Sequence, residues 1–493
     1  MAEALTRQAD VVVVGSGPGG ATVARQLSRA GKRVVLLERG HDHRGRFYYG
    51  SHLGALVYSD KNSLLFTDEG LNVIRPIMTG GATNMYCGAA ARPPDWFKGK
   101  YGVDVGRYVE ETIDELRVGP LPPELRGAAS QRVMETAVDL GYDWQPMMKF
   151  MNPARAARFD CGAKCMLGCR CGAKWTANEY VDDAVGAGCE LITGARVDRL
   201  IIEDGRVLGV VGKLGRRQPF EVRAEVVVLA AGGIGTPIIM QNSGFFDAGN
   251  GIAMDVTVLV YGVSKEPGNA FEPPMTVAYV DDENGYVLST LIDPWFLYPL
   301  ITALKGPKYP FTMRNYRNTL GLMIKIKDDV SGTISMEGRI SKPMTSQDQY
   351  RLNHAAIVCR KILVKTGCDP DSIFVSPQRG THPSCTVRIG EMVDTNLQTE
   401  VKNLYVCDAS TFPEALDRPT VLTIISLGKR LSDHLLATVF RREVETRREP
   451  VATDPLAVPP EPLVMPEPPT PSPSPARCRS AVENDDGGPS PLA

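Results

Sequence analysis

Three glycines and one glutamate near the N-terminus have the spacing of a dinucleotide-binding turn. Gly15, Gly17 and Gly20 form a G-x-G-x-x-G motif between a valine-rich run and a helix-patterned segment. The first glycine permits a tight bend, the second lets backbone approach a pyrophosphate, and the third lets the helix pack close to the strand. The helix would direct its free N–H groups and positive dipole end at the phosphates. Glu38 ends the next apolar run, where an acid that binds the adenosine ribose is expected.

Four cysteines form a second group of residues that could do chemistry. Cys161, Cys165, Cys169 and Cys171 are spaced C-x3-C-x3-C-x-C. Soft thiolate ligands select iron–sulfur clusters or zinc over harder cations. We therefore predict an iron–sulfur cluster on the first three, with Cys171 as a fourth ligand or a substitute. Zinc, buried thiols and a loop-stabilising disulfide are the alternatives, because the spacing matches no standard ferredoxin signature.

Length, charge and hydropathy limit the kind of protein that positions these residues. A chain of 493 residues exceeds one ordinary core and predicts two domains with appendages. A formal net charge of −2 argues against a nucleic-acid partner. No stretch approaches the roughly twenty apolar residues that span a bilayer, and the N-terminus lacks the apolar core of a signal peptide. We expect a cytoplasmic protein that acts on small molecules and has no transmembrane segment.

Residues 189–244 return to the pattern of the N-terminal segment. Residues 189–213 alternate as strands do, with an Asp-Gly hairpin signal at Asp204 and Gly205. A further apolar run then leads into a Gly-Gly turn and a helix-patterned segment. The first of these strands contains Val197 and is expected to lie along the adenine. The alternative is an accessory sheet of the same domain.

Residues 251–369 contain fewer glycine turns and more aromatic, β-branched and methionine residues. Strands are predicted at 256–263, 275–280 and 321–326, which indicates a second, sheet-based domain that carries the substrate wall. Within it, the apolar segment 294–304 is too short to span a bilayer. It is either packed core or a hydrophobic lip that contacts the substrate or a membrane surface, so a position peripheral to the membrane is also considered.

The predicted fold class is α/β, with a doubly wound, Rossmann-like domain and an inserted sheet-based substrate domain. The dinucleotide domain is discontinuous and comprises residues 1–40, 78–100, 160–250 and 381–445. The substrate domain comprises 251–380 with parts of 41–77 and 101–159. Residues 446–493 are rich in proline and serine and are expected to form a disordered tail.

Three blocks resemble the glucose-methanol-choline (GMC) family of FAD oxidoreductases. TGGATNMYCGAAARPPDW is similar to the family's first signature, and GGIGTPIIMQNSG is close to its second. THPSCTVRIGEMVDTNLQTEVKNLYVCDASTFP, followed by RPTVLTIISLGKRL, is similar to the C-terminal block that returns to the flavin. The resemblance extends from residue 10 to about residue 436.

The resemblance implies FAD, and we expect noncovalent binding because no residue stands out as a covalent anchor; a link to His41, His43 or Cys87 is the alternative. In the first signature a Gly-Gly turn and a downstream Asn flank the flavin, and they correspond to Gly80, Gly81 and Asn84. In the C-terminal block an Asp-Ala-Ser turn lies near the flavin, and its first residues correspond to Asp408 and Ala409.

The resemblance also implies oxidation of an alcohol CH–OH group to a carbonyl. In the family, hydride moves from the carbinol carbon to the flavin while a histidine takes the hydroxyl proton, and His382 matches that histidine. A second catalytic histidine or asparagine usually follows, but here the matching position is Arg418 or Pro419. Arg418 could hold an alkoxide or an anionic substrate group, and Asn84 is a further candidate for positioning the reacting groups.

The cysteine stretch resembles two groups within the family. It is similar to the insertion of bacterial membrane-linked glucose dehydrogenases, which hold a three-iron cluster there, and to a stretch of long-chain alcohol oxidases. A cluster favours a dehydrogenase that passes electrons to a quinone or a protein acceptor, and oxygen is the alternative acceptor. The unusual Arg418-Pro419 pair motivates a flavoenzyme acting on a carbon–carbon bond as a rival. A non-catalytic flavin-binding subunit is a second rival.

Overall fold

The glycine motif follows directly after the first strand of a seven-stranded sheet, whose central strands are parallel. Its order is β8-β2-β1-β11-β10-β9, with β21 paired to β11. The strands are β1 (Leu5–Val14), β2 (Val34–Glu38), β8 (Glu190–Thr193), β9 (Ala195–Glu203), β10 (Arg206–Leu214), β11 (Gln218–Leu229) and β21 (Leu404–Val406). β1 pairs in parallel with β2 and β11. Its valines 11–13 are fully buried, because strands covered on both faces consist of continuous apolar runs.

The computed structural model describes residues 4–159, 162–303 and 306–441. Cys161, predicted as a metal ligand, and the tail predicted for residues 446–493 lie outside the described residues. Within Met1–Arg441, which forms one unit by its internal contacts, the mixed α/β fold predicted from the sequence is confirmed. The domain boundaries given above stay a prediction.

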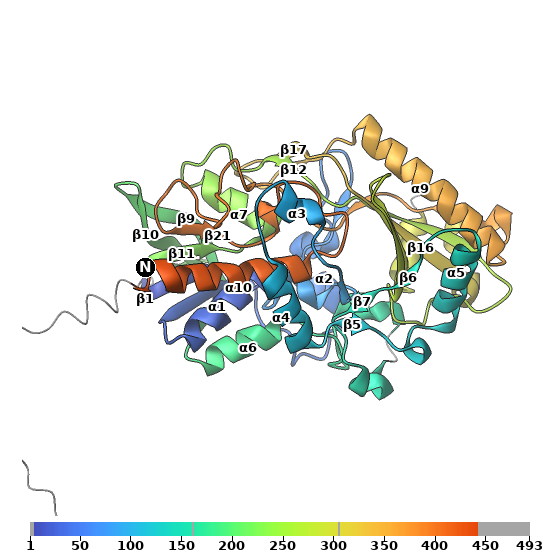
Figure 1. Cartoon of the computed structure of the whole chain (residues 1–493), viewed down its shortest axis with the longest axis horizontal. Helices are drawn as coiled ribbons and strands as arrows, with labels where there is room; N and C mark the ends of the chain where they lie inside the picture. The colour runs from blue at the N-terminus through green and yellow to red at the C-terminus, as the bar shows by residue number, and fades with distance from the viewer. Residues whose placement is uncertain (1–3, 160–161, 304–305, 442–493) are drawn as a thin grey trace, which may run out of the picture. The chain divides into compact units, whose positions relative to one another are not determined.

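Helices cover the first sheet and bring distant parts of the chain together. Helix α1 (Pro18–Arg29) packs against α10 (Val421–Thr438), and the two lie side by side in Figure 1. Helix α6 (Asn178–Gly186) also packs against α1, and α4 (Gly106–Leu116) packs against α10. Helix α1, the first helix of the chain, is thereby covered by α10, the last described helix.

The second large sheet has eight strands in the order β3-β20-β13-β16-β15-β14-β6, with β19 paired to β13. The strands are β3 (Asn72–Val73), β6 (Gln145–Pro146), β13 (Thr257–Val263), β14 (Val277–Asp281), β15 (Tyr286–Thr290), β16 (Thr319–Ile326), β19 (Phe374–Val375) and β20 (Arg379–Gly380). All three strands predicted between residues 251 and 369 are present, with ends shifted by a few residues. The central pair β13 and β16 is antiparallel.

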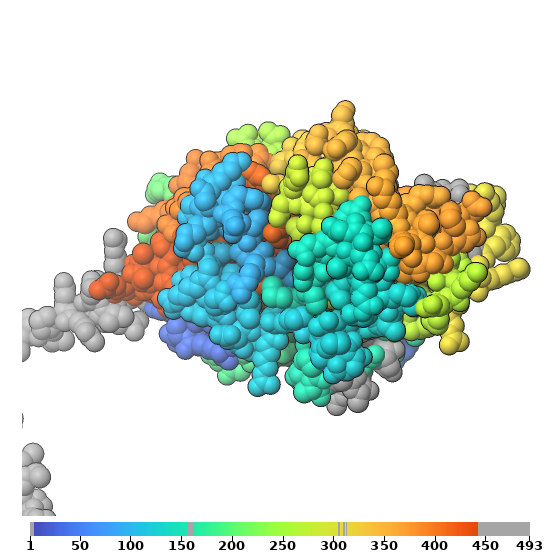
Figure 2. Space-filling view, turned by 45° about the vertical axis from the view of Figure 1, so that its right-hand side comes forward, coloured from blue at the N-terminus to red at the C-terminus, as the bar shows by residue number. Residues whose placement is uncertain are grey.

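Alternation along β16 separates its side chains between two faces. Leu322 and Ile324 belong to the apolar cluster that contains the buried side of α9 (Ser346–Lys365). Met323 and Lys325 point the opposite way and line the large cavity described below, because successive side chains of a strand alternate between faces. Helix α5 (Ala128–Asp139) packs against α9 and β14, and on the face shown in Figure 2 their segments adjoin.

Shorter elements connect and border the two sheets. Two small sheets contain β12 (Asn250–Ile252), β17 (Ser331–Ile334) and β18 (Ile340–Ser341), and β4 (Ala89–Ala90), β7 (Met148–Lys149) and β5 (Gly119–Pro120). The remaining α-helices are α2 (His52–Tyr58), α3 (Asp95–Gly99), α7 (Gly232–Gln241) and α8 (Leu297–Ala303). Helix α8 accounts for most of the apolar segment 294–304, where Trp295 and Leu300 are exposed. In the described part of the chain, no helix is long and apolar enough to cross a membrane.

Candidate active site

A cavity of about 1020 Å³ extends from the glycine turn at the end of β1 to His382 after β20. This volume is at the upper end of the range for small-molecule and cofactor sites. Its lining includes the turn Gly15–Gly19, the strand end Glu38, the segment Gly81–Thr83, the start of β9 around Val197, and Asp408 with Ala409. The cavity therefore unites most of the residues predicted to bind a dinucleotide.

Each of the three motif glycines is required for a different local reason. Gly15 has a φ of +102°, and a Cβ there would lie 2.3 Å from the carbonyl oxygen of Ala230. A Cβ on Gly20 would lie 1.9 Å from the carbonyl oxygen of Gly15, so this glycine allows α1 to pack against β1. A Cβ on Gly17 would meet no atom within 4 Å, and Gly17 lines the cavity. Its small size leaves room for a ligand rather than for a protein neighbour.

Two helices begin at the cavity with no side-chain cap. The N-cap residues are Gly17 for α1 and Thr420 for α10, and neither makes a side-chain capping bond. Both residues line the cavity. The N–H groups at a helix N-terminus need acceptors, and phosphate oxygens are well suited to supply them. This geometry fits a pyrophosphate group.

The two carboxylates predicted to contact the cofactor also order the loops around it. Glu38 accepts hydrogen bonds from the Ser16 peptide N–H (3.0 Å), the Ser16 hydroxyl (2.6 Å) and the Gly40 N–H (2.7 Å). Asp408 accepts from the Gly232 N–H at 2.8 Å and the Thr236 hydroxyl at 2.6 Å. Each carboxylate thus fixes a glycine-containing turn that borders the cavity. The predicted ribose contact of Glu38 stays a prediction.

Two ionisable side chains, Asp255 and Lys325, meet at the imidazole of His382. Asp255 Oδ2 lies 2.8 Å from His382 Nδ1. Lys325 Nζ lies 2.9 Å from the same nitrogen and 3.4 Å from Nε2. Asp255 and Lys325 are buried, whereas the His382 side chain is 27% exposed, and both His382 and Lys325 line the cavity.

Burial dominates the electrostatics of this group. Desolvation lowers the pKa of His382, and the charge of Lys325 lowers it further, while the hydrogen bond to Asp255 raises it. Burial also lowers the pKa of Lys325, against the attraction of Asp255. A neutral imidazole is therefore favoured at neutral pH. When Nδ1–H donates to Asp255, Nε2 carries the lone pair and can accept a proton.

Asp255 and Lys325 were not predicted from the sequence. Lys325 is the one charged residue in the fully buried strand TLGLMIKI, and a lone charge in such a run is a usable signal. Asp255 lies two residues before Thr257, which pairs with both Lys325 and Arg379 across the sheet. That convergence depends on strand register, which the sequence does not show.

Asn84, a candidate for catalysis and flavin contact, makes its side-chain hydrogen bonds within its own loop and to two neighbouring side chains. Its amide donates to the carbonyl oxygens of Thr79 and Gly81, at 2.8 and 3.0 Å. Its carbonyl oxygen accepts from Tyr49 Oη and Asn178 Nδ2, and the side chain is fully buried. The structure therefore shows Asn84 shaping the loop after Gly80, and these contacts occupy its polar atoms.

Arg418, the other catalytic candidate, is held by two carboxylates. Its guanidinium pairs with Asp417 at 2.7 Å and with Asp282 at 2.5 Å. Its neighbours Pro419 and Thr420 line the cavity. The structure thus brings Lys325 to His382 and holds Arg418 in a separate ion-pair group.

The cysteine group gives no support to the predicted iron–sulfur cluster. Cys165, Cys169 and Cys171 line a small cavity of about 10 Å³, roughly the space of one water. The sulfur atoms of Cys169 and Cys171 are 3.7 Å apart. Among the described residues, which exclude Cys161, no group of three or more His, Cys, Asp or Glu could hold a metal ion.

The cavity, the glycine turn and the parallel sheet define a dinucleotide-binding α/β protein, and residues 13–73 match the NAD(P)-binding Rossmann-like domain. Residues 90–257 and 369–428 match the two parts of the GMC oxidoreductase family. The chain belongs to the GMC oxidoreductase family. Membership implies FAD as the cofactor, and the open space at Gly17 and the uncapped starts of α1 and α10 fit its pyrophosphate.

Similar proteins include oxidases and a dehydrogenase. Long-chain-alcohol oxidase FAO4B from Arabidopsis thaliana is 24% identical over 87% of this chain and 67% of its own length. The 2-methyl-1,2-propanediol dehydrogenase of Mycolicibacterium austroafricanum is 28% identical over 48% of this chain and 51% of its own length. The structure of pyridoxine 4-oxidase from Mesorbium loti has the same fold, with a TM-score of 0.65, 17% identity, and coverage of 87% of this chain and 99% of that one. These comparisons do not support a preference for a dehydrogenase over an oxidase.

Proposed function

We propose that this chain is an FAD-dependent enzyme that oxidises a long-chain primary alcohol to its aldehyde, with His382 as the base. The observation that carries the proposal is the contact of Asp255 with His382 Nδ1 at 2.8 Å, at one end of the cavity that begins at the glycine turn. This contact leaves Nε2 to accept the hydroxyl proton. The bound flavin would accept the hydride of the carbinol carbon.

The cofactor would be held by groups along the cavity. Backbone from Gly15 to Gly19 would contact the pyrophosphate, and Glu38 with Val197 would border the adenosine. Asp408 and Ala409, next to the start of α10, would lie on the flavin side together with Gly81. These residues all line the cavity, and this assignment is part of the proposal.

Apolar side chains around the outer part of the cavity favour an apolar alcohol. Six of the large hydrophobic residues that line the cavity are also exposed on the surface: Leu56, Leu64, Phe66, Phe296, Leu300 and Met336. Exposed apolar side chains at the edge of a cavity often mark a ligand-binding groove. Together with the plant relative's name, this favours a substrate with a long hydrocarbon chain. The same relative makes dioxygen the acceptor that we propose.

The test is anaerobic mixing of the flavin-loaded protein with 1-dodecanol under stopped flow. We expect the flavin absorbance to bleach, and expect air to restore it with release of hydrogen peroxide. Bleaching that air does not reverse, but an artificial quinone does, would identify a dehydrogenase instead. No bleaching with 1-dodecanol or with a panel of shorter and secondary alcohols would refute alcohol oxidation. A flavoenzyme acting on carbon–carbon bonds or a non-catalytic subunit would then be favoured.

A further inference from the structure

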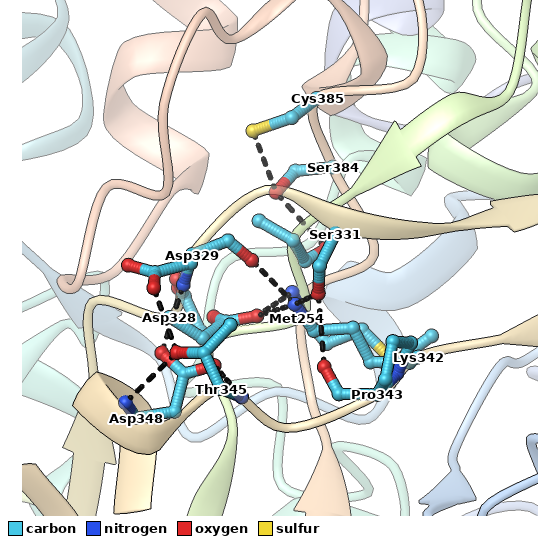
Figure 3. Close-up of polar contacts among 12 residues, drawn as sticks. Met254, Asp328, Asp329, Ser331, Lys342, Pro343, Thr345, Asp348, Ser384 and Cys385 are labelled. Atoms are coloured by element: carbon cyan, nitrogen blue, oxygen red, sulfur yellow. Dashed lines mark hydrogen bonds and ion pairs between the residues drawn. The ribbon is translucent and has the colours of Figure 1, made fainter. Parts of the chain in front are cut away.

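Lys325 differs from the four other buried lysines, each of which has an oxygen acceptor within 3.0 Å; one of them, Lys429, pairs with Glu115 at 2.7 Å. An ammonium has three N–H donors. Lys149 Nζ donates to three carbonyl oxygens at 2.7 to 3.2 Å, and Lys174 Nζ does so at 2.6 to 3.0 Å. Lys342 Nζ contacts the Asp329 carbonyl oxygen, the Ser331 hydroxyl and the Asp328 carboxylate, as Figure 3 shows. These three lysines have complete sets of acceptors.

Lys325 has no such set among the described residues. Its nearest contacts are with the two ring nitrogens of His382, and a longer one reaches the Thr381 hydroxyl at 3.4 Å. The closest carboxylate oxygen, Asp255 Oδ2, is 3.9 Å away. The side chain is 5% exposed, yet it lines the cavity. A buried charge in this state lacks an acceptor that a ligand in the cavity could supply.

The geometry also specifies where that ligand atom would lie. Lys325 Nζ and His382 Nε2 are 3.4 Å apart. Because Nζ is closer to Nδ1, at 2.9 Å, it lies over the imidazole ring rather than in line with the in-plane lone pair of Nε2. A hydroxyl oxygen on that lone pair would give its proton to Nε2, and a rotation of the flexible lysine side chain would bring Nζ within about 2.7–3.2 Å of the same oxygen.

We propose that Lys325 is a second catalytic residue, whose ammonium group binds the substrate oxygen next to His382 Nε2 and stabilises the negative charge that develops on it. This inference rests on the proposed function. In this step the O–H proton would go to Nε2, the C–O bond would become C=O, and the electron pair of the carbinol C–H bond would leave as hydride, which bound oxidised flavin would accept. Lys325 stays protonated throughout, so the step needs no further reactant. Losing one preplaced donor at a developing oxyanion lowers the rate roughly a hundredfold to a thousandfold in other enzymes.

The charged neighbours of Lys325 predict how the role depends on pH. The groups that act on it are Asp255, Cys87, Asp417, Asp328 and His382. Burial lowers the pKa of Lys325 below its ordinary value of 10.5 despite the acidic neighbours. The protonated form is therefore lost at a lower pH than in an exposed lysine, and activity should fall with it. Arginine stays protonated over this range, so Lys325→Arg should shift that alkaline limb upward or remove it.

The experiment compares Lys325→Met, Lys325→Arg and the control Lys361→Met in the flavin-loaded protein. Lys361 is exposed on α9, so its loss makes the same change in net charge away from the cavity. With 1-dodecanol under stopped flow, we expect Lys325→Met to lower the limiting rate of flavin reduction at least a hundredfold. Lys325→Arg should recover at least a tenth of the wild-type rate, and Lys361→Met should match wild type.

A binding measurement separates this inference from the proposed function. Dodecanoate carries an anionic oxygen on a similar chain, and its binding can be followed in the visible spectrum of the bound flavin without turnover. We expect Lys325→Met to weaken its binding at least tenfold. A wild type that binds dodecanoate through Lys325 but is not reduced by any alcohol would refute the proposed reaction alone. Equal binding to wild type and Lys325→Met, no binding to either, or an unchanged reduction rate in Lys325→Met would overturn the role of Lys325.

Discussion

Asp255 reaches His382 from a left-handed backbone conformation: its φ is +47°, and its Oδ2 lies 2.8 Å from Nδ1 of the imidazole. A non-glycine residue in this region is strained by roughly 1–3 kcal/mol and persists only where its surroundings hold it. Here the peptide N–H of Met254 donates to Asp328, and the carbonyl oxygen of Met254 accepts from the N–H of His382 at 2.9 Å. The backbone before Asp255 is thereby tied to the histidine that its carboxylate orients.

Replacing His382 by alanine should separate cofactor binding from chemistry. We expect the variant to retain FAD, because the glycine turn and the starts of α1 and α10 are unchanged. The rate of flavin reduction by alcohol should fall on the order of a hundredfold or more, as the loss of a general base commonly does. Stopped-flow reduction at saturating 1-dodecanol measures this. A rate equal to that of wild type would give His382 a purely structural role.

Asp255→Asn should alter the tautomer and the pH profile together. The carboxylate raises the pKa of His382, so its loss lowers that pKa further. Because the neutral imidazole is the active form, the acid limb of the reduction rate should move to lower pH. The limiting rate should also fall roughly tenfold or more, since the amide no longer fixes Nδ1–H. Nitrogen NMR of the labelled imidazole reports the tautomer, and an unchanged spectrum and profile would contradict the role of Asp255.

Gly17→Val and Gly20→Ala should fail in different ways. A side chain at Gly17 meets no protein atom within 4 Å, so the variant should fold, with a cost of no more than about 1 kcal/mol at the N-cap. It should lose FAD, because the side chain occupies the cavity. At Gly20 the added Cβ collides with backbone at 1.9 Å, which should lower stability by roughly 1–3 kcal/mol or more. Titration of the apoproteins with FAD and thermal unfolding distinguish the two.

Lys342→Met should strongly destabilise the fold, although Lys342 lies outside the cavity lining. Its ammonium pairs with Asp328 at 2.9 Å, and both side chains are fully buried (Figure 3). Removing one partner leaves a buried charge uncompensated, at a cost of roughly 3–5 kcal/mol. The double variant Asp328→Leu with Lys342→Met should recover much of this loss. Denaturant unfolding measures both, and additive losses in the double variant would contradict the pairing.

The free energy of unfolding should decrease as pH rises, because Asp328 titrates in the folded protein. Burial raises the pKa of this carboxyl from 3.8 to about 6 in the folded protein, while Lys342 opposes the shift. The folded state therefore binds this proton more tightly than the unfolded state does. The stabilisation that the bound proton gives is lost as pH rises from about 4 to about 6. Asp328→Asn should flatten the free energy of unfolding over this window. Part of the slope should remain, because the pKa of Asp417 is also raised to about 6.

The N-terminal part of the fold could be predicted because its information is local. The valines of β1, the three glycines and Glu38 lie within about thirty consecutive residues and obey the short-range rules of a strand, a turn and a helix. The family blocks then located His382. Both predictions depend on residue types at fixed spacing, which a single sequence displays directly.

The surroundings of His382 could not be predicted, because they are set by register between distant strands. Lys325 lies opposite Thr257 in the antiparallel pair of β13 and β16, and shifting that register by one residue would turn Lys325 toward α9. Similarly, the resemblance placed Arg418 or Pro419 at a catalytic position, yet Asp282 and Asp417 hold the guanidinium of Arg418. The position of a charged side chain in a motif is set by the oppositely charged groups that the fold brings to it, which the motif does not show.

The pairing of β21 with β11 and the packing of α10 on α1 have a consequence for biosynthesis. The glycine turn is synthesised long before the opposite wall of the cavity, from Thr381 to Ile424. Until β21 and α10 follow, the nascent glycine turn therefore borders an open, one-sided groove. The cavity can close around a ligand only after these later segments have been synthesised, and chains that lack them cannot complete it.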